Sequence, residues 1–294
     1  MNRREFLFQT AAATSGLACL NRVRVFAEST GVTWPIGCFN RAWSKWGIDA
    51  ALDGIKGAGY TLAGLLTRTK ADPFVGSDST PEYLQALKTK IAARNLKANL
   101  GTIYARTNLP YADAVRDLHR QIDNAKTLEL EYLMNFGVDR PEEYEAYYKL
   151  MADASAYAQE RALKVVLKPH GGGSGASEEI LRCIKKINHP NFSIWYDAGN
   201  IIYYTGKDPV TELDPIAQYV TGFCAKDCAQ PKGEVMVQLG TGKVDFKRVF
   251  SRLKTAGFHG PIMLEGSNPG KSPDEATANA KANREFLERI LASL

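Results

Sequence analysis

Ionisable side chains stand at the ends of four successive apolar segments in the second half of the chain. Lys168 and His170 end the first of these segments, and Asp197, Lys226 and Glu265 end the next three. Lys168 and His170 are two residues apart, so an extended segment points them to the same face. Burying such groups without partners costs several kcal/mol. We therefore expect them to converge in one polar site, with a purely structural network of ion pairs as the alternative.

A mixture of carboxylates, an imidazole and an ammonium suits proton transfer. Glu265 is the predicted general base, and His170, whose ordinary pKa is near neutrality, is the predicted second acid or base. Neighbouring carboxylates favour the charged form of Lys168, which makes it a clamp for a carbonyl or enolate oxygen rather than a nucleophile. The glycines 171–173 would let the backbone next to His170 approach a ligand closely. A structural histidine is the alternative.

Four further polar residues are candidate substrate-binding groups: Asn40, Asn200, Lys226 and Asp227. For Asn40, a role in a turn or cap fits the sequence equally well. Lys226 and Asp227 are adjacent, and pairing with each other is their alternative role. Aromatic residues near the expected strand ends could offer apolar faces to the ring of a ligand, with core packing as the alternative for most of them: Trp43, Trp46, Tyr104, Phe136, Tyr203 and Tyr204.

The elements that position these residues alternate regularly along the chain. We expect strands at 35–40, 62–67, 97–104, 132–138, 164–170, 192–200, 220–227 and 261–267. We expect helices at 48–58, 81–94, 111–128, 141–162, 177–188, 210–219, 246–257 and 273–291. Strict alternation predicts a parallel sheet. Eight such units, with no glycine-rich nucleotide-binding turn after the first strand, favour a single-domain α/β fold, the (β/α)8 TIM barrel, whose sites lie at the carboxyl ends of the strands.

The first 27 residues have the three parts of an export signal in order. An arginine pair followed by Glu5-Phe6-Leu7 resembles the twin-arginine signal, residues 8–20 are weakly apolar, and Val25-Phe26-Ala27 resembles a cleavage site. We therefore expect residues 1–27 to be a twin-arginine-type signal peptide, with the twin-arginine translocase as a partner during export. The mature protein, residues 28–294, would be periplasmic or secreted. A frayed N-terminal helix is the alternative.

Composition narrows the class of protein further. The net charge is +5, and the four arginines and one glutamate of residues 1–27 account for three of these charges. No basic run with interleaved aromatic residues follows, so nucleic acid is not an expected partner. Cysteines 38, 183, 224 and 228 show neither disulfide-framework nor metal-site spacing and are expected to be buried free thiols. A homo-oligomer is left open.

Four motifs, in order on the expected strands, resemble those of the sugar phosphate isomerase/epimerase superfamily, whose members are xylose-isomerase-like TIM barrels. They are Asp197-Ala198-Gly199-Asn200, Lys226-Asp227, the loop from Gly240 to Phe246, and the segment from Gly260 to Glu265. The resemblance implies isomerase or epimerase chemistry on a sugar, with a divalent metal held by Glu, Asp, His and Glu on strands five to eight. It also implies that two Glu residues move a proton beside a carbonyl that the metal polarises.

Two of the four ligand positions depart from this pattern, because Lys168 replaces the first Glu and Cys224 the His. An ammonium would strongly repel Mn²⁺ or Mg²⁺ in a low-dielectric site. Lys168 can then replace the metal, or a divalent metal (Mn, Mg or Zn) can shift onto His170, Asp197 and Glu265. In a third outcome the site has no catalytic activity.

The departures leave three functions open. The first is isomerisation or epimerisation of a sugar or polyol ketone by proton abstraction next to its carbonyl. The second is β-elimination from a 3-keto-glycoside, by a lyase or hydrolase in which Lys168 stands for the metal-binding Glu. The third is a non-catalytic carbohydrate-binding barrel. A small-molecule carbohydrate is the expected ligand in all three.

Overall fold

The computed structural model describes residues 32–70 and 72–294, which form a closed barrel of eight parallel strands. The strands are β1 (Ile36–Phe39), β2 (Leu62–Leu65), β3 (Lys97–Thr102), β4 (Tyr132–Asn135), β5 (Lys164–Leu167), β6 (Phe192–Tyr196), β7 (Val220–Ala225) and β8 (Ile262–Leu264). Each strand pairs with its sequence neighbours, and β8 closes on β1 through Gly37 and Met263. The predicted TIM barrel is confirmed.

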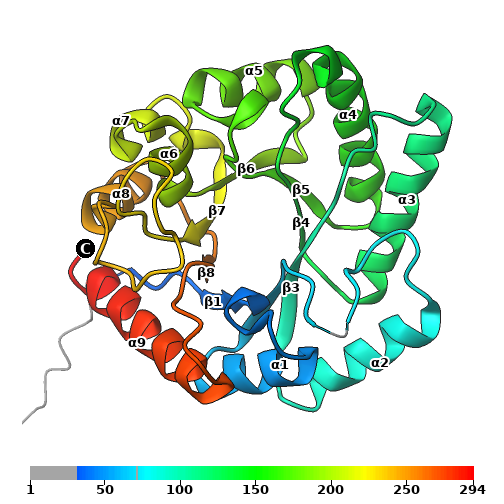
Figure 1. Cartoon of the computed structure of the whole chain (residues 1–294). Coiled ribbons are helices and arrows are strands. Elements are labelled where there is room, and N and C mark those ends of the chain that lie inside the picture. The colour runs from blue at the N-terminus through cyan, green and yellow to red at the C-terminus, as the bar shows by residue number, and fades with distance from the viewer. Residues whose placement is uncertain (1–31, 71) are drawn as a thin grey trace, which may run out of the picture. The chain divides into compact units, whose positions relative to one another are not determined.

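Helices surround the strands as an outer ring (Figure 1). They are α1 (Ile48–Gly57), α2 (Pro81–Ala92), α3 (Tyr111–Thr127), α4 (Tyr144–Glu160), α5 (Ser177–Ile187), α6 (Ala198–Thr205), α7 (Pro209–Leu213), α8 (Phe246–Thr255) and α9 (Pro273–Ala292). Short 3₁₀ turns include η1 (Asn40–Trp43), which follows β1, and η4 (Ala217–Tyr219). The apolar faces of the α-helices pack on the outside of the strands, and this contact makes up most of the core.

Two sequence predictions of secondary structure are wrong in detail. The strand expected at 192–200 ends at Tyr196, because the Asp197 side chain accepts from the backbone N–H of Asn200 and starts α6 as its N-cap. The helix expected at 210–219 is divided into α7 and η4. Pro215 lies in the gap between them, where a proline cannot continue the helical hydrogen-bond pattern.

Two layers of side chains fill the barrel along its axis. The lower layer is apolar and is formed by Phe39, Leu66, Leu100, Met134, Val166, Trp195, Cys224 and Met263. Because strand side chains alternate between faces, the residue two positions further along points to the same side. For six of these residues that next position holds a charged group: Arg41, Arg68, Lys168, Asp197, Lys226 and Glu265. The barrel thus changes from apolar to charged within two residues of its carboxyl end.

Several sequence expectations concern other parts of the chain. The predicted export signal and its cleavage site lie outside the described residues and stay predictions. Cys38, Cys183, Cys224 and Cys228 are buried and unpaired, as predicted. No helix among residues 32–70 and 72–294 has the length and apolar character needed to cross a membrane.

Candidate active site

Two lysines and two acids meet where β5 to β8 end. The Lys168 ammonium contacts Glu265 Oε2 and lies 3.1 Å from Asp197 Oδ2. The Lys226 ammonium lies 2.6 Å from Glu265 Oε1 and also 3.1 Å from Asp197 Oδ2. All four residues are at most 2% exposed. Each lysine therefore bridges both carboxylates, and we call these four residues, with Arg41, the charged cluster.

Arg41 is the fifth member of the charged cluster, and the sequence reasoning missed it. It lies in η1, two residues beyond Phe39 of the lower layer, and its guanidinium donates to Glu265 Oε1. The spacing of two from an inward-facing strand residue is the signal that could have found it. With Arg41, three formal positive charges surround two negative ones, so the cluster carries a net charge of +1 in its fully ionised form.

Local backbone features hold the acids and lysines in place. Asp197 Oδ1 is fixed as the N-cap of α6 by the N–H of Asn200, at 2.8 Å. Asn200 also accepts from the Lys226 ammonium and donates to the carbonyl of Pro169. A Cβ at Gly199 would come within 2.7 Å of the carbonyl oxygen of Lys226, so only glycine lets α6 approach the end of β7 this closely.

The mutual pairing sets the charge state of the charged cluster. Burial opposes ionisation of the Glu265 carboxyl, but Lys168, Lys226 and Arg41 outweigh it and hold its pKa well below the usual range. Burial likewise opposes the charge of Lys168, but Glu265 and Asp197 raise its pKa. A carboxylate that is stabilised so strongly is a weak base. The cluster is therefore better suited to stabilising a negative charge than to taking up a proton.

A polar pocket of about 320 Å³ opens above the charged cluster. Arg41, Lys226, Asn200 and His170 line this polar pocket, together with Lys232 and Tyr204. Lys168 is not among the residues that line it. Lys226 and Arg41 are thus the cations of the cluster that would face a molecule bound in the polar pocket. Lys168 contacts both carboxylates but does not line this pocket.

His170 lies at the border of the polar pocket and a second, aromatic one. Its ring nitrogens are 3.1 and 3.3 Å from the hydroxyl of Tyr204, and its ring packs against Phe136, with the ring centroids 5.1 Å apart. Partial burial and the positive charges of Lys168 and Lys226 lower the pKa of His170 to about 4. The imidazole is therefore neutral near pH 7, so a ring nitrogen has a lone pair available, although the lowered pKa makes it a weaker base than an ordinary histidine.

The side chains of two other predicted substrate-binding residues are hydrogen-bonded to the chain's own backbone. Asp227 accepts from the N–H groups of Cys228, Gly240, Gly242 and Val244, at 2.8 to 3.1 Å. It therefore anchors the loop that begins at Gly240, and its neighbour Lys226 pairs with Asp197 and Glu265 instead. Asn40 accepts from the N–H groups of residues 66 and 67 and donates to the carbonyl of Thr67, which is the turn role left open above.

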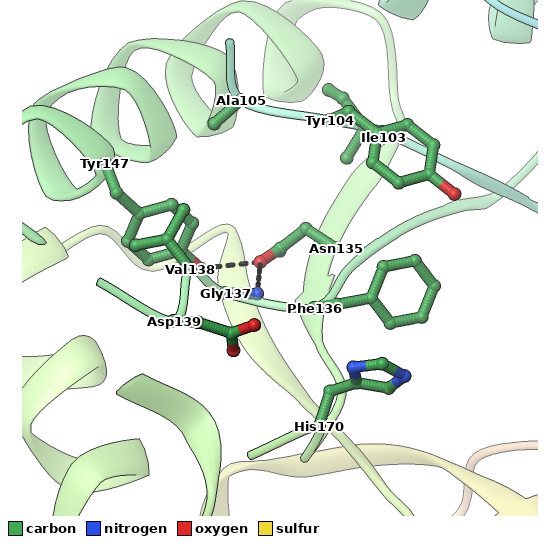
Figure 2. A pocket seen from close by; sticks show the side chains of 10 residues that line it. All are labelled: Ile103, Tyr104, Ala105, Asn135, Phe136, Gly137, Val138, Asp139, Tyr147 and His170. Carbon is green, nitrogen blue, oxygen red and sulfur yellow. Dashed lines mark hydrogen bonds between the residues drawn. The ribbon is translucent and has the colours of Figure 1, made fainter. Parts of the chain in front are cut away.

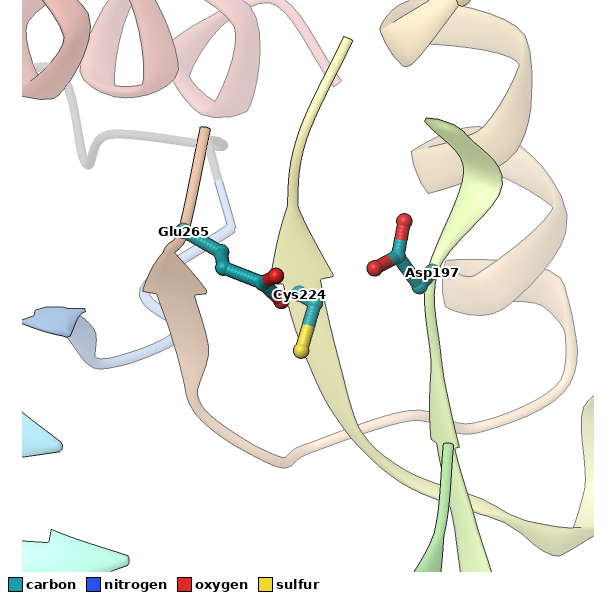
Figure 3. A group of neighbouring side chains, drawn as sticks. All are labelled: Asp197, Cys224 and Glu265. Carbon is teal, nitrogen blue, oxygen red and sulfur yellow. The ribbon is translucent and has the colours of Figure 1, made fainter. Parts of the chain in front are cut away.

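Two acids of the charged cluster and Cys224 of the lower layer are possible metal ligands, but their contacts do not fit a metal. Among the described residues, Asp197, Cys224 and Glu265 offer ligand atoms within 4.8 Å of one another, and His170 lies outside this group (Figure 3). Two ammoniums already contact the carboxylates and would repel a divalent ion held there. Burial also raises the pKa of the Cys224 thiol well above its usual range, whereas a metal binds the thiolate.

The sequence profile of one family, described as the xylose isomerase-like TIM barrel, matches residues 52–290. The chain belongs to this family. A xylose isomerase domain protein from Planctomyces limnophilus shares the fold, with a TM-score of 0.70, 20% identity and coverage of 90% of this chain and 100% of that one. So does a xylose isomerase-like TIM barrel protein from Mycobacterium smegmatis, in complex with magnesium, with a TM-score of 0.71, 14% identity and coverage of 89% and 97%.

Two epimerases are also among the similar proteins. The D-allulose 3-epimerase from a Methylomonas species, in complex with D-allulose, has a TM-score of 0.69 at 17% identity and covers 88% of this chain and 99% of that one. The L-ribulose-5-phosphate 3-epimerase UlaE of Salmonella paratyphi B is 31% identical over 108 residues. That alignment spans 36% of this chain and 36% of the epimerase, about a third of the length of the curated relative.

Proposed function

We propose that this chain is an enzyme that removes a proton from the carbon next to a carbonyl in a sugar or sugar-derived ketone. The single observation that supports this most is the excess positive charge of the charged cluster beneath the polar pocket. Abstraction of such a proton leaves an enolate, whose oxygen carries a negative charge. Groups preorganised to bind that charge accelerate the reaction. The sugar epimerases among the similar proteins support this class of substrate.

In this mechanism the Lys226 ammonium and the Arg41 guanidinium bind the carbonyl oxygen, and they bind it more tightly as it becomes an enolate. Lys168 keeps Glu265 and Asp197 ionised and aligned with Lys226, which makes it a positioning residue. We propose His170, rather than the predicted Glu265, as the base. Both Glu265 oxygens are paired with cations, whereas the His170 imidazole is neutral and lines the polar pocket.

The electrons of the broken C–H bond move into the enolate, and the proton moves to a ring nitrogen of His170. Return of a proton to the same carbon gives the starting sugar or its epimer. If the adjacent carbon carries a leaving group, as in a 3-keto-glycoside, the electrons can expel it instead and form a carbon–carbon double bond. Both outcomes need the same first step, and the product separates the epimerase from the lyase.

We further propose that the two ammoniums take the place of a catalytic metal. Metal analysis of purified protein should then find well under one Mn, Mg or Zn ion per chain. Prolonged treatment with a chelator should leave the rate unchanged. A stoichiometric metal whose removal abolishes activity and is reversed by adding the metal back would contradict this assignment.

The experiment for the proposed function is hydrogen exchange in D2O. A set of ketoses and 3-keto-glycosides is incubated with the protein, and deuterium at the carbon next to the carbonyl is followed by NMR. A His170→Gln variant is the matched control, because it keeps a polar side chain but lacks a base. Sugar binding without exchange for any member of the set would instead support the non-catalytic carbohydrate-binding barrel.

We also propose that residues 1–27 direct export through the twin-arginine translocase. Replacing Arg3 and Arg4 by lysine should retain the protein in the cytoplasm of a host that has this pathway. The measurement is immunoblotting of fractionated cells. Equal export of the variant and the unaltered chain would show that the arginine pair is not read as a signal.

A further inference from the structure

A second pocket, which we call the aromatic pocket, adjoins the polar pocket. It has a volume of about 420 Å³ and lies at the ends of β3 and β4 (Figure 2). Tyr104, Phe136 and Val138 are among its lining residues, and His170 lines both pockets. The charged half of the barrel mouth and its aromatic half are thus continuous at the proposed base.

Aromatic rings lead outward from the base in this pocket. The centroid of the Phe136 ring is 5.1 Å from that of His170 and 5.9 Å from that of Tyr104. The Lys168 ammonium is 5.8 Å from the Phe136 centroid. Tyr104 is 43% exposed although it is a large apolar residue. An exposed aromatic group beside a pocket is typical of a binding surface for an apolar ligand.

Most polar groups of the aromatic pocket already form hydrogen bonds within the protein. Asn135 Oδ1 accepts from the hydroxyl of Tyr147 and from the N–H of Gly137, and its amide donates to the carbonyl of Val166 (Figure 2). Asp139 is the exception, because it lines the pocket and its side chain is exposed to solvent. A second sugar ring would bring hydroxyls that find few free partners here. An apolar group fits the lining better.

We infer that the substrate has two parts: a keto-sugar ring in the polar pocket, joined to a flat aromatic aglycone in the aromatic pocket. This inference deepens the proposed function and rests on it for the placement of the sugar. His170 would then lie where the two parts join, next to the carbon that bears the aglycone. Ring stacking against Tyr104 and Phe136 supplies affinity, and the charged cluster supplies the chemistry.

The test compares two ligands that differ only in the aglycone, phenyl 3-keto-glucoside and methyl 3-keto-glucoside. Calorimetric affinities are measured with the unaltered chain, with Tyr104→Ala, which removes the exposed ring, and with Ala105→Trp, which fills the pocket. Tyr111→Ala is the matched control, because Tyr111 is an exposed tyrosine that does not line the pocket. Far-ultraviolet circular dichroism checks that each variant is folded.

We expect the phenyl ligand to bind the unaltered chain at least tenfold more tightly than the methyl ligand. The ratio should fall below threefold in Tyr104→Ala and Ala105→Trp and stay unchanged in Tyr111→Ala. Equal affinities for the two ligands, or tighter binding of a keto-disaccharide than of the phenyl ligand, would overturn the inference. Exchange in D2O is measured separately, so a phenyl preference without any exchange would refute the proposed function and leave the two-part binding site standing.

Discussion

The two halves of the barrel mouth are built on opposite principles. The ends of β5 to β8 bring charged side chains together so that each is paired with several others. The ends of β3 and β4 present aromatic rings, and the buried amide of Asn135 is satisfied by its own surroundings. The first half keeps a net positive charge that a reacting molecule can use. The second half keeps apolar surface and few unpaired polar groups.

The difference shows how a barrel of this family can change its chemistry while keeping its fold. A lysine at the end of β5 converts a set of acids into a network of ion pairs, and the strands beneath it need no adjustment. The apolar lower layer, including Trp195 and Met263, isolates the charges from the far end of the barrel. The aromatic half depends mainly on the loops that follow β3 and β4.

The largest effect that would test this contrast is the loss of Lys168. Lys168→Met keeps the length of the side chain but leaves buried carboxylates with one ammonium fewer. Breaking a buried ion pair in this way costs about 3–5 kcal/mol of folding free energy. Urea unfolding at pH 7 measures this loss of folding free energy.

The control for Lys168→Met is Lys186→Met, which removes an exposed ion pair with Glu145 whose atoms are 2.9 Å apart. Such surface pairs contribute at most about 1 kcal/mol. If both variants lose the same small amount, the charged cluster is no stronger than a surface pair, and the contrast between the two halves fails.

The next largest effect concerns the rate of exchange. Lys226→Met removes a cation that lines the polar pocket and contacts both Glu265 and Asp197. Loss of one preorganised group that binds a developing oxyanion lowers kcat by about 100- to 1000-fold. The measurement is the rate of deuterium uptake under saturating ligand, with Lys186→Met as the control. A rate within threefold of the unaltered chain would remove Lys226 from the mechanism.

Much of the charged half could be predicted from the sequence, but of the aromatic half only Tyr104 and Phe136 are candidates, among six aromatic residues. Lys168, Asp197, Lys226 and Glu265 each directly follow a strand and are two residues beyond an inward-facing apolar one, so their convergence follows from strand periodicity. The barrel fold could likewise be predicted, from the eight-fold alternation of strands and helices. The periodicity of a strand is a local signal, so it can be recognised in the sequence without knowing the course of the loops.

The remaining features depend on contacts between distant segments. Arg41 belongs to a 3₁₀ turn rather than a strand, so its spacing of two from Phe39 could suggest where its side chain points but not its contact with Glu265. The choice of His170 over Glu265 as base required knowing that both Glu265 oxygens are paired. The aromatic pocket joins Tyr104, Phe136 and His170 through the course of three loops, which no pattern in the sequence specifies.

A smaller effect on the rate is expected when the pH is changed, through His170 at the border of the two halves. The pKa of His170 is lowered to about 4, so the ring is neutral above that value and active as a base. The rate should therefore be level between about pH 5 and pH 8 and fall as the pH drops through about 4. The groups that act on the ring are Lys168 and Lys226, which lower its pKa, Glu265 and Asp197, which raise it, and the hydroxyl of Tyr204.

The control for the pH profile is His170→Gln, whose residual rate should not show this limb. The folded state also binds this proton less readily than the unfolded chain, whose histidine has a pKa of about 6.5. This group therefore destabilises the fold progressively as the pH falls from about 6.5 to about 4, and the glutamine variant should lose less stability in that window. A limb near pH 6.5 in the unaltered chain would mean that burial and the two lysines do not lower the pKa of His170.

The smallest effect belongs to the aromatic half. Tyr147→Phe removes the hydroxyl that donates to Asn135 Oδ1, while the N–H of Gly137 still donates to the same oxygen. Loss of one buried hydrogen bond with an alternative donor present costs about 1 kcal/mol of folding free energy. The exchange rate should stay within twofold, because Tyr147 holds the wall of the aromatic pocket and takes no part in proton transfer. A tenfold loss of rate without a loss of stability would place chemistry in both halves of the mouth and end the division between them.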